Sequence, residues 1–277
     1  MNAINPERWL ARPWFFYACL VLLTLVGLSG CAAGSGVDAA GSGADLVTAS
    51  DEPPARKRAR IRLELAVGYF EQGQTTVALD ELKQSLITDP SYAEAYSLRG
   101  LIYLRLNDMR LAEESFRRAI ALNPQDANVL HNYGWMLCQQ ARYSESSQAF
   151  TQAIANPTYG GRAKTWMTQG LCQVRAGQPA EAEFSLGRSY ELDAGNPVTG
   201  YNLAVLLFQR NQLERAQFYV RRLNNSELAN VESLWLGIKV ERRLNNQEAV
   251  DQLAGQLKKR YPQSRELTAF DKGAFNE

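Results

Sequence analysis

Apolar and small residues recur along most of this chain with a period of 34 positions, beginning near Ala59. If Ala59 is position 1 of a unit, Ala93 and Ala127 begin the next two units. Small residues return at positions 8 and 20, bulky residues at positions 4, 7, 11 and 24, and proline at position 32. Small residues let two helices approach closely, bulky residues fill the space between them, and proline ends the second helix. The pattern therefore predicts a series of helix pairs.

The second unit carries the pattern most completely, with Gly100 at position 8, Ala112 at position 20, Phe116 at position 24 and Pro124 at position 32. A 34-residue period with these positions is the tetratricopeptide pattern. We expect about six units, starting near residues 59, 93, 127, 163, 197 and 230, with two residues inserted around 157–161. The last unit departs most from the pattern and is either a true unit or a cap.

The predicted fold class is all-α, a right-handed superhelix of helix-turn-helix units over residues 57–265. Each pair leaves an apolar face that only the next pair covers, so the units stack and leave a concave groove. Residues 266–277 are expected to form a C-terminal tail.

The groove is lined chiefly by positions 2, 5, 9, 12 and 13 of the first helix of each unit. In the first four units this lining is apolar with scattered polar groups, and it suits an extended or helical apolar segment of a partner protein. The alternative is that several of these side chains only cover neighbouring helices. With Asn132 added from position 6, the candidate groove residues are Leu63, Val67, Phe70, Leu101, Leu104, Arg105, Asn128, His131, Asn132, Trp135, Lys164, Met167, Leu171 and Arg175.

The first 31 residues have the character of a secretory signal. Arg8 and Arg12 precede an uncharged apolar run of 15 residues, Trp14 to Leu28, which is shorter than the ~20 residues of a transmembrane helix. The run ends in Leu28-Ser29-Gly30-Cys31, which resembles the bacterial lipobox. A long signal anchor and an ordinary cleavage site with an unrelated cysteine are the alternatives. We interpret residues 1–30 as a lipoprotein signal peptide and Cys31 as the lipidated residue.

In that interpretation, acyl chains on Cys31 anchor the protein to a membrane. The next residue, Ala32, is not the Asp that holds enterobacterial lipoproteins in the inner membrane, which favours the periplasmic face of the outer membrane. Residues 31–56 are rich in Ala, Gly and Ser and show no apolar periodicity. They are expected to form a flexible tether between the bilayer and the folded units.

Charge and residue counts exclude several kinds of function. The chain has 30 Lys and Arg against 29 Asp and Glu, a balance that argues against nucleic-acid binding. The single histidine, His131, excludes a catalytic histidine pair and a multi-histidine metal site; for His131 itself, contact with a bound peptide and a plain exposed position are both open. The chain holds no nucleophile elbow, phosphate loop, dinucleotide-binding glycine pattern or HExxH motif. We predict a monomer that is not an enzyme and that uses no cofactor and no metal.

Two cysteines remain after Cys19 leaves with the signal peptide and Cys31 is lipidated. Cys138 and Cys172 are 34 positions apart, on the first helices of adjacent units, in a compartment that is oxidising. A disulfide needs Cα atoms about 4.4–6.8 Å apart, which only facing residues of neighbouring helices reach. We predict a disulfide between them; two buried free thiols are the alternative.

A lipobox, a short tether and about six tetratricopeptide units together resemble the type IV pilus biogenesis and stability lipoproteins, the PilF/PilW family. Local segments extend the resemblance over roughly residues 57–265. His131-Asn132-Tyr133-Gly134 is similar to the family's Asn-Asn-Tyr-Gly, and Leu236-Gly237-Ile238 and Lys259-Arg260-Tyr261-Pro262 are similar to its C-terminal segments.

The resemblance implies a pilotin, an outer-membrane lipoprotein that binds the type IV pilus secretin in the periplasm and promotes its localisation and multimerisation. Cys31 would then anchor the protein, and the groove of the first four units would capture the secretin. The alternatives are a periplasmic adaptor lipoprotein for a protease or a peptidoglycan enzyme, an enzyme of unrecognised type, and a purely structural role in the envelope.

Overall fold

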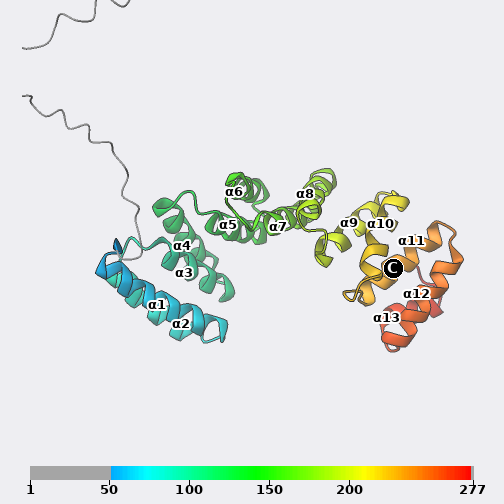
Figure 1. The fold of residues 1–277 in the computed structure, drawn as a ribbon, viewed down its shortest axis with the longest axis horizontal. Helices are drawn as coiled ribbons and strands as arrows, with labels where there is room; N and C mark the ends of the chain where they lie inside the picture. Colours follow the sequence, from blue (N-terminus) through cyan, green and yellow to red (C-terminus); the bar gives the residue numbers. More distant parts are fainter. Residues whose placement is uncertain (1–50, 276–277) are drawn as a thin grey trace, which may run out of the picture. The chain divides into compact units, whose positions relative to one another are not determined.

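The computed structural model describes residues 51–275, and within that range the regular structure is helical throughout. Twelve helices form six pairs, and a thirteenth follows them (Figure 1). The pairs are α1 (Pro54–Glu71) and α2 (Thr75–Thr88), α3 (Ala93–Arg105) and α4 (Met109–Leu122), α5 (Ala127–Gln139) and α6 (Tyr143–Ala155), α7 (Arg162–Arg175) and α8 (Pro179–Leu192), α9 (Pro197–Gln209) and α10 (Leu213–Asn224), and α11 (Val231–Arg243) and α12 (Gln247–Arg260); α13 spans Arg265–Asp271. The predicted signal peptide, Cys31 and most of the predicted tether lie outside the described residues.

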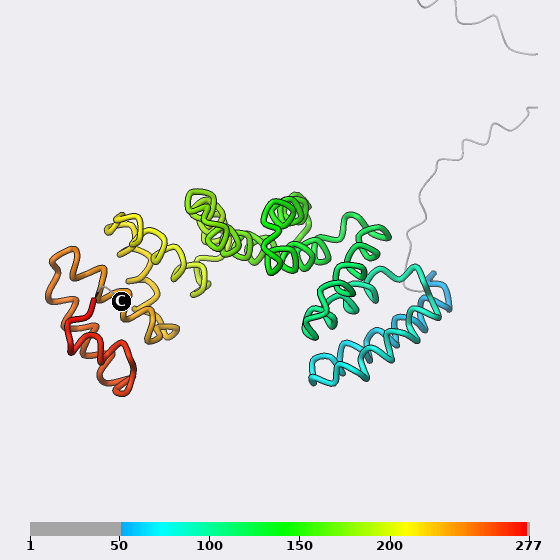
Figure 2. The backbone as a smooth tube through the Cα atoms, turned by 180° about the vertical axis from the view of Figure 1, so that it is seen from behind, coloured from blue at the N-terminus to red at the C-terminus, as the bar shows by residue number. Residues whose placement is uncertain are grey.

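The predicted fold class is confirmed, because the six pairs are tetratricopeptide units stacked one against the next (Figure 2). The first helices of units two to six begin within one residue of the predicted starts. The first helix begins earlier, at Pro54, because proline at the first helical position costs no hydrogen bond. Residues 54–56, predicted as tether, therefore belong to α1. The sixth unit is a complete helix pair.

Glycines at position 8 let the two helices of a pair approach closely. A Cβ atom at Gly100 would lie 2.7 Å from the ring of Phe116, and one at Gly134 would lie 2.9 Å from the ring of Phe150. Both phenylalanines are fully buried. Each bulky side chain at position 24 therefore occupies the space that a side chain at position 8 would need.

The turns between the two helices of each unit share one backbone feature. A residue with positive φ recurs at the same point of all six units, and these residues are Gly73, Asn107, Ala141, Gly177, Asn211 and Asn245. Glycine and asparagine enter this left-handed region readily, whereas alanine does so at a cost. The turn geometry is therefore fixed by the repeat, even where the local residue is unfavourable for it.

The predicted C-terminal tail, residues 266–277, is instead folded as far as it is described. The Ser264 hydroxyl accepts a hydrogen bond from the Leu267 amide at 3.1 Å and caps α13. Leu267 is buried in the apolar cluster of the sixth unit. Phe275 stacks on Trp235 of α11, with ring centroids 5.4 Å apart. The prediction was wrong because these apolar residues follow no 34-residue pattern. They nevertheless pack on the apolar surface of the sixth unit.

Candidate partner-binding surfaces

The predicted groove residues lie on α1, α3, α5 and α7, and they are not equally available to a partner. Val67, Arg105, Asn128, Lys164 and Arg175 are exposed. Most of the others are half-buried, because they also cover neighbouring helices; the half-buried residues are Leu63, Phe70, Leu101, Leu104, Asn132, Trp135, Met167 and Leu171. Five of the predicted groove residues are therefore available to a partner, and eight also contribute to the packing between helices.

Two pairs of predicted groove residues meet across unit boundaries. The Arg105 guanidinium lies 3.7 Å from the ring centroid of Phe70 and donates a hydrogen bond of 2.8 Å to the Phe70 carbonyl. Arg175 lies 5.1 Å from the ring centroid of Trp135. Contacts of this kind are worth about 0.5–1 kcal/mol at exposed sites. These arginines therefore help hold successive units together, and they shield one face of each aromatic ring.

His131 is not a groove residue, and that part of the prediction was wrong. Only 6% of it is exposed, its Nδ1 lies 2.8 Å from the Thr165 hydroxyl of α7, and its ring packs 5.8 Å from that of Phe150. Burial, and then the positive charge of Lys164, lower the pKa of His131 from 6.5 to about 4. The imidazole is therefore neutral at physiological pH, and it packs between the third and fourth units.

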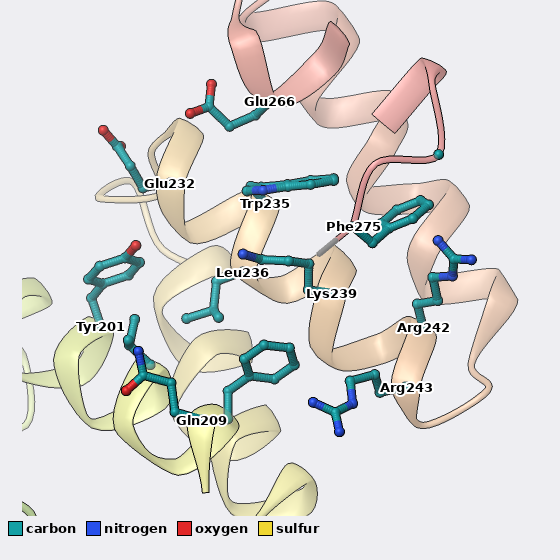
Figure 3. A pocket seen from close by; sticks show the side chains of 13 residues that line it. Tyr201, Gln209, Glu232, Trp235, Leu236, Lys239, Arg242, Arg243, Glu266 and Phe275 are labelled. Atoms are coloured by element: carbon teal, nitrogen blue, oxygen red, sulfur yellow. The ribbon is translucent and has the colours of Figure 1, made fainter. Parts of the chain in front are cut away.

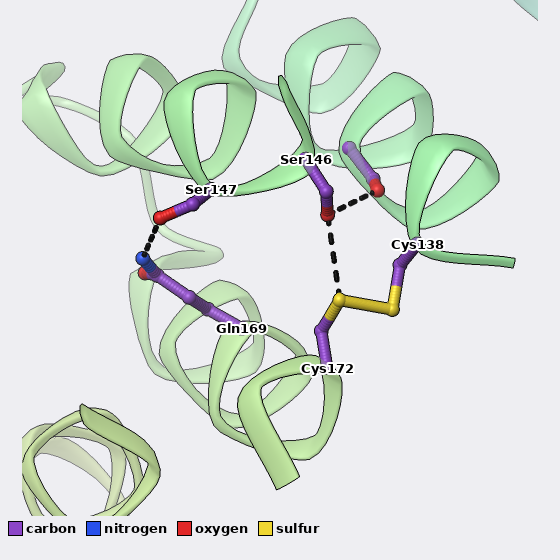
Figure 4. The surroundings of a disulfide bond; sticks show 6 residues. Cys138, Ser146, Ser147, Gln169 and Cys172 are labelled. Carbon is purple, nitrogen blue, oxygen red and sulfur yellow. Dashed lines mark hydrogen bonds between the residues drawn. A yellow bond between two sulfur atoms is a disulfide. The ribbon is translucent and has the colours of Figure 1, made fainter. Parts of the chain in front are cut away.

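A disulfide joins Cys138 of α5 to Cys172 of α7, with Cα atoms 6.0 Å apart (Figure 4). Next to it, the Ser146 hydroxyl donates a hydrogen bond of 2.7 Å to the Gly134 carbonyl. Ser146 occupies position 20, where most units have alanine, and it is fully buried. The hydroxyl is accommodated there because this hydrogen bond satisfies it. The bridge thus connects the first helices of two adjacent units.

Among the described residues, no helix pair covers one face of α1 in the first unit. Position 3 of the first helix is buried in units two to five, where it packs against the preceding pair, and the residues are Ala95, Val129, Thr165 and Thr199. At the same position, Ile61 is 47% exposed, and Leu65, one turn further on, is 44% exposed. Gly68 lies on the same side of the helix, and a Cβ atom there would meet nothing within 4 Å. Ile61 thus occupies the position that units two to five bury against the preceding helix pair.

A second concave site, which the sequence reasoning missed, lies between α9, α11 and the C-terminal segment (Figure 3). The pocket has a volume of about 940 Å³. Aromatic and charged side chains dominate its lining, which comprises Tyr201, Val205, Phe208, Gln209, Glu232, Trp235, Leu236, Lys239, Arg242, Arg243, Glu266, Gly273 and Phe275. The groove positions of the fifth and sixth units would have pointed to part of it, but Phe275 and Glu266 lie beyond the repeats.

No group of three or more metal-ligating side chains occurs within residues 51–275. Over the same range, none of the helices is both long and apolar enough to cross a membrane. The surfaces above are therefore the candidate functional features of the described chain.

The chain matches known proteins in three comparisons: with family models, with full-length protein sequences and with solved structures. Tetratricopeptide repeat models match residues 63–127, 115–148 and 173–234. The type IV pilus assembly protein PilF of Pseudomonas aeruginosa is 30% identical over 259 residues, which cover 91% of this chain and 97% of that protein.

Two solved structures are also similar. The structure of Pseudomonas aeruginosa PilF superposes with a TM-score of 0.71 at 28% identity, covering 80% of this chain and all of that one. The structure of PilW, described as a widely conserved type IV pilus biogenesis factor, superposes with a TM-score of 0.67 at 31% identity, covering 76% of this chain and 97% of that one.

Proposed function

The chain belongs to the PilF/PilW family of type IV pilus biogenesis proteins, and from this we propose that it is a pilotin for the type IV pilus secretin. It binds the secretin in the periplasm and promotes its localisation and multimerisation in the outer membrane. Membership of this family agrees with the prediction that the chain is not an enzyme, since tetratricopeptide units act by binding other proteins.

The proposed anchor is a lipid on Cys31 at the periplasmic face of the outer membrane. The supporting observation is the lipobox-like Leu28-Ser29-Gly30-Cys31 after an apolar run of signal length. Anchoring confines the protein to one leaflet, which raises its effective concentration near a secretin at the same membrane.

The observation that carries the capture step is the face of α1 that no described helix pair covers. Ile61 is exposed at the position that units two to five bury against the preceding helix pair, and Leu65, one turn further on, is exposed beside it. Because these side chains are about half exposed, covering them fully is worth about half of the 1.5–3 kcal/mol of a complete burial, or about 0.7–1.5 kcal/mol each. We propose that an amphipathic helical segment of the secretin packs here as the next layer of the stack, in contact with Val67 at the rim of the groove.

The test compares strains with and without the gene by blotting unboiled outer-membrane fractions for the secretin. Loss of multimers with accumulation of monomer is expected in the deletion strain. The Cys31→Ala variant is expected to leave the outer-membrane fraction and to lower the multimer level. Multimers that persist unchanged without the gene would show that the pilotin proposal is wrong.

Point variants then test the capture surface. Ile61→Asp and Leu65→Asp are expected to lower multimer levels while the lipoprotein stays at the membrane in normal amount. The matched control is Ile87→Asp, which makes the same change at a residue of α2 that is 65% exposed, and it is expected to keep multimers at the wild-type level. Equal effects of Ile61→Asp and Ile87→Asp would exclude α1 as the capture surface.

A further inference from the structure

The pocket between α9, α11 and the C-terminal segment holds positive charge that no carboxylate of the described residues neutralises. The Lys239 ammonium lies 5.9 Å from the ring centroid of Phe208 and 5.6 Å from that of Trp235. The Arg242 guanidinium covers Phe275 at 3.6 Å. Arg243 covers Phe208 at 5.1 Å and donates a hydrogen bond to the neutral Asn211 side chain. Within residues 51–275 none of these three cations forms an ion pair, in contrast to many other arginines of the chain.

Partial burial makes this uncompensated charge costly. Lys239 is half-buried, and desolvation lowers its pKa below the ordinary value. A ligand carboxylate in the pocket would restore the lost solvation of the Lys239 ammonium, and it would accept hydrogen bonds from the exposed guanidinium groups nearby. In the unliganded protein, the pocket therefore contains a partly desolvated cation that a bound anionic group would stabilise.

The rest of the pocket restricts which anion fits. Glu232 and Glu266 lie at one end and Arg242 and Arg243 at the other, with Trp235 and Lys239 between them (Figure 3). Glu232 and Glu266 also have no ion-pair partner within residues 51–275. They repel a ligand that is acidic along its whole length, while the half-buried rings of Tyr201 and Phe208 offer surface to an apolar group. The size of the pocket is within the ~300–1,000 Å³ of small ligand and peptide sites.

We propose that this pocket is a second partner-binding site, which holds a short protein segment whose carboxylate side chain neighbours an aromatic or aliphatic one. The carboxylate lies between Lys239 and Arg243, and the apolar side chain packs on Tyr201 and Phe208. The site is about four units away in sequence from the α1 face, so one scaffold binds two different chain segments. It goes beyond the proposed capture of the secretin and does not depend on it.

The experiment selects ligands without assuming their sequence. A random heptapeptide library displayed on phage is panned on the purified full chain in detergent, and enriched peptides are labelled with fluorescein and titrated by polarisation. We expect enriched peptides with one carboxylate beside an aromatic or aliphatic residue. Replacing that carboxylate by its amide should weaken binding at least about tenfold, as expected for a charge-assisted hydrogen bond, and added salt should weaken binding as well.

Charge-neutral variants locate the binding. Lys239→Gln and Arg243→Gln are each expected to weaken binding at least about tenfold. The Tm of Lys239→Gln should change by no more than about 4 °C, because Lys239 has only its two ring contacts to lose and the desolvation of its charge offsets part of them. Lys258→Gln makes the same charge change on α12 outside the pocket and should leave affinity unchanged, as should Ile61→Asp on α1. The proposal is overturned if no peptide is enriched, if enriched peptides lack a carboxylate, or if they bind Lys239→Gln as tightly as the wild type.

Discussion

Ala141 occupies a left-handed backbone conformation that, within residues 51–275, is otherwise adopted by glycine and asparagine. Its φ is 58°, and the equivalent residue in each of the other five units is Gly73, Asn107, Gly177, Asn211 or Asn245. The Ala141 side chain is exposed, so a substitution there changes the backbone energy with little effect on packing. Ala141→Gly and Ala141→Asn are therefore expected to stabilise the protein.

The magnitude follows from two opposing effects. The left-handed conformation costs an alanine about 1–2 kcal/mol. Glycine removes this strain but adds conformational entropy to the unfolded chain, which costs about 0.4–1 kcal/mol. The expected net gain for Ala141→Gly is about 0.5–1 kcal/mol. Asparagine tolerates the conformation without the full entropy loss of glycine, so Ala141→Asn should gain at least as much.

Urea unfolding followed by circular dichroism measures the effect, with hydrogen exchange of the α5 and α6 amides as a local readout, because stacked repeats can open unit by unit. Ala121→Gly on α4 makes the same chemical change in ordinary helical backbone and should destabilise by about 0.5–1 kcal/mol. Gly177→Ala should also destabilise. The reasoning is refuted if Ala141→Gly and Ala141→Asn both fall at or below the wild-type stability.

Three buried sites allow comparable tests. Gly100→Ala places a methyl group against the Phe116 ring, so urea unfolding should show a loss of about 1–3 kcal/mol, whereas Gly68→Ala meets open space and should be neutral or stabilising. Replacing Cys138 and Cys172 by serine opens a cross-link that spans 34 residues and should cost about 3–4 kcal/mol; recovering both cysteines alkylated without reductant would contradict the bridge. The pKa of His131 is lowered from 6.5 to about 4, so the unfolded chain takes up a proton that the folded chain does not. Stability from the neutral imidazole is then present above pH 6.5 and lost as pH falls toward 4, by up to about 3 kcal/mol; the single imidazole should not titrate above about pH 5 by NMR, and His131→Asn should lack this pH-dependent loss.

The units of the fold could be predicted from the sequence because they are set by local rules. Gly100 and Phe116 lie 16 residues apart and meet within one helix pair, so the spacing alone indicates the contact. The predicted start of the fourth unit, residue 163, differs by one from the observed Arg162. Side chains whose neighbours come from the next unit were harder to assign. His131 was assigned to the groove from its position in α5, but its burial depends on Thr165 of α7, beyond the irregular insertion.

The C-terminal pocket shows where a repeat pattern stops being informative. Its apolar wall combines Trp235, a regular residue of the sixth unit, with Phe275, which belongs to no unit. Within residues 51–275 no further helix pair follows the sixth unit, so its outer face needs another cover or stays exposed. Here α13 and Phe275 cover part of that face. The cover stops short of Lys239, whose ammonium stays half-buried without an ion pair among the described residues. The two surfaces that we propose as binding sites therefore lie at the first and the last units, where the described chain covers the repeat surface least completely.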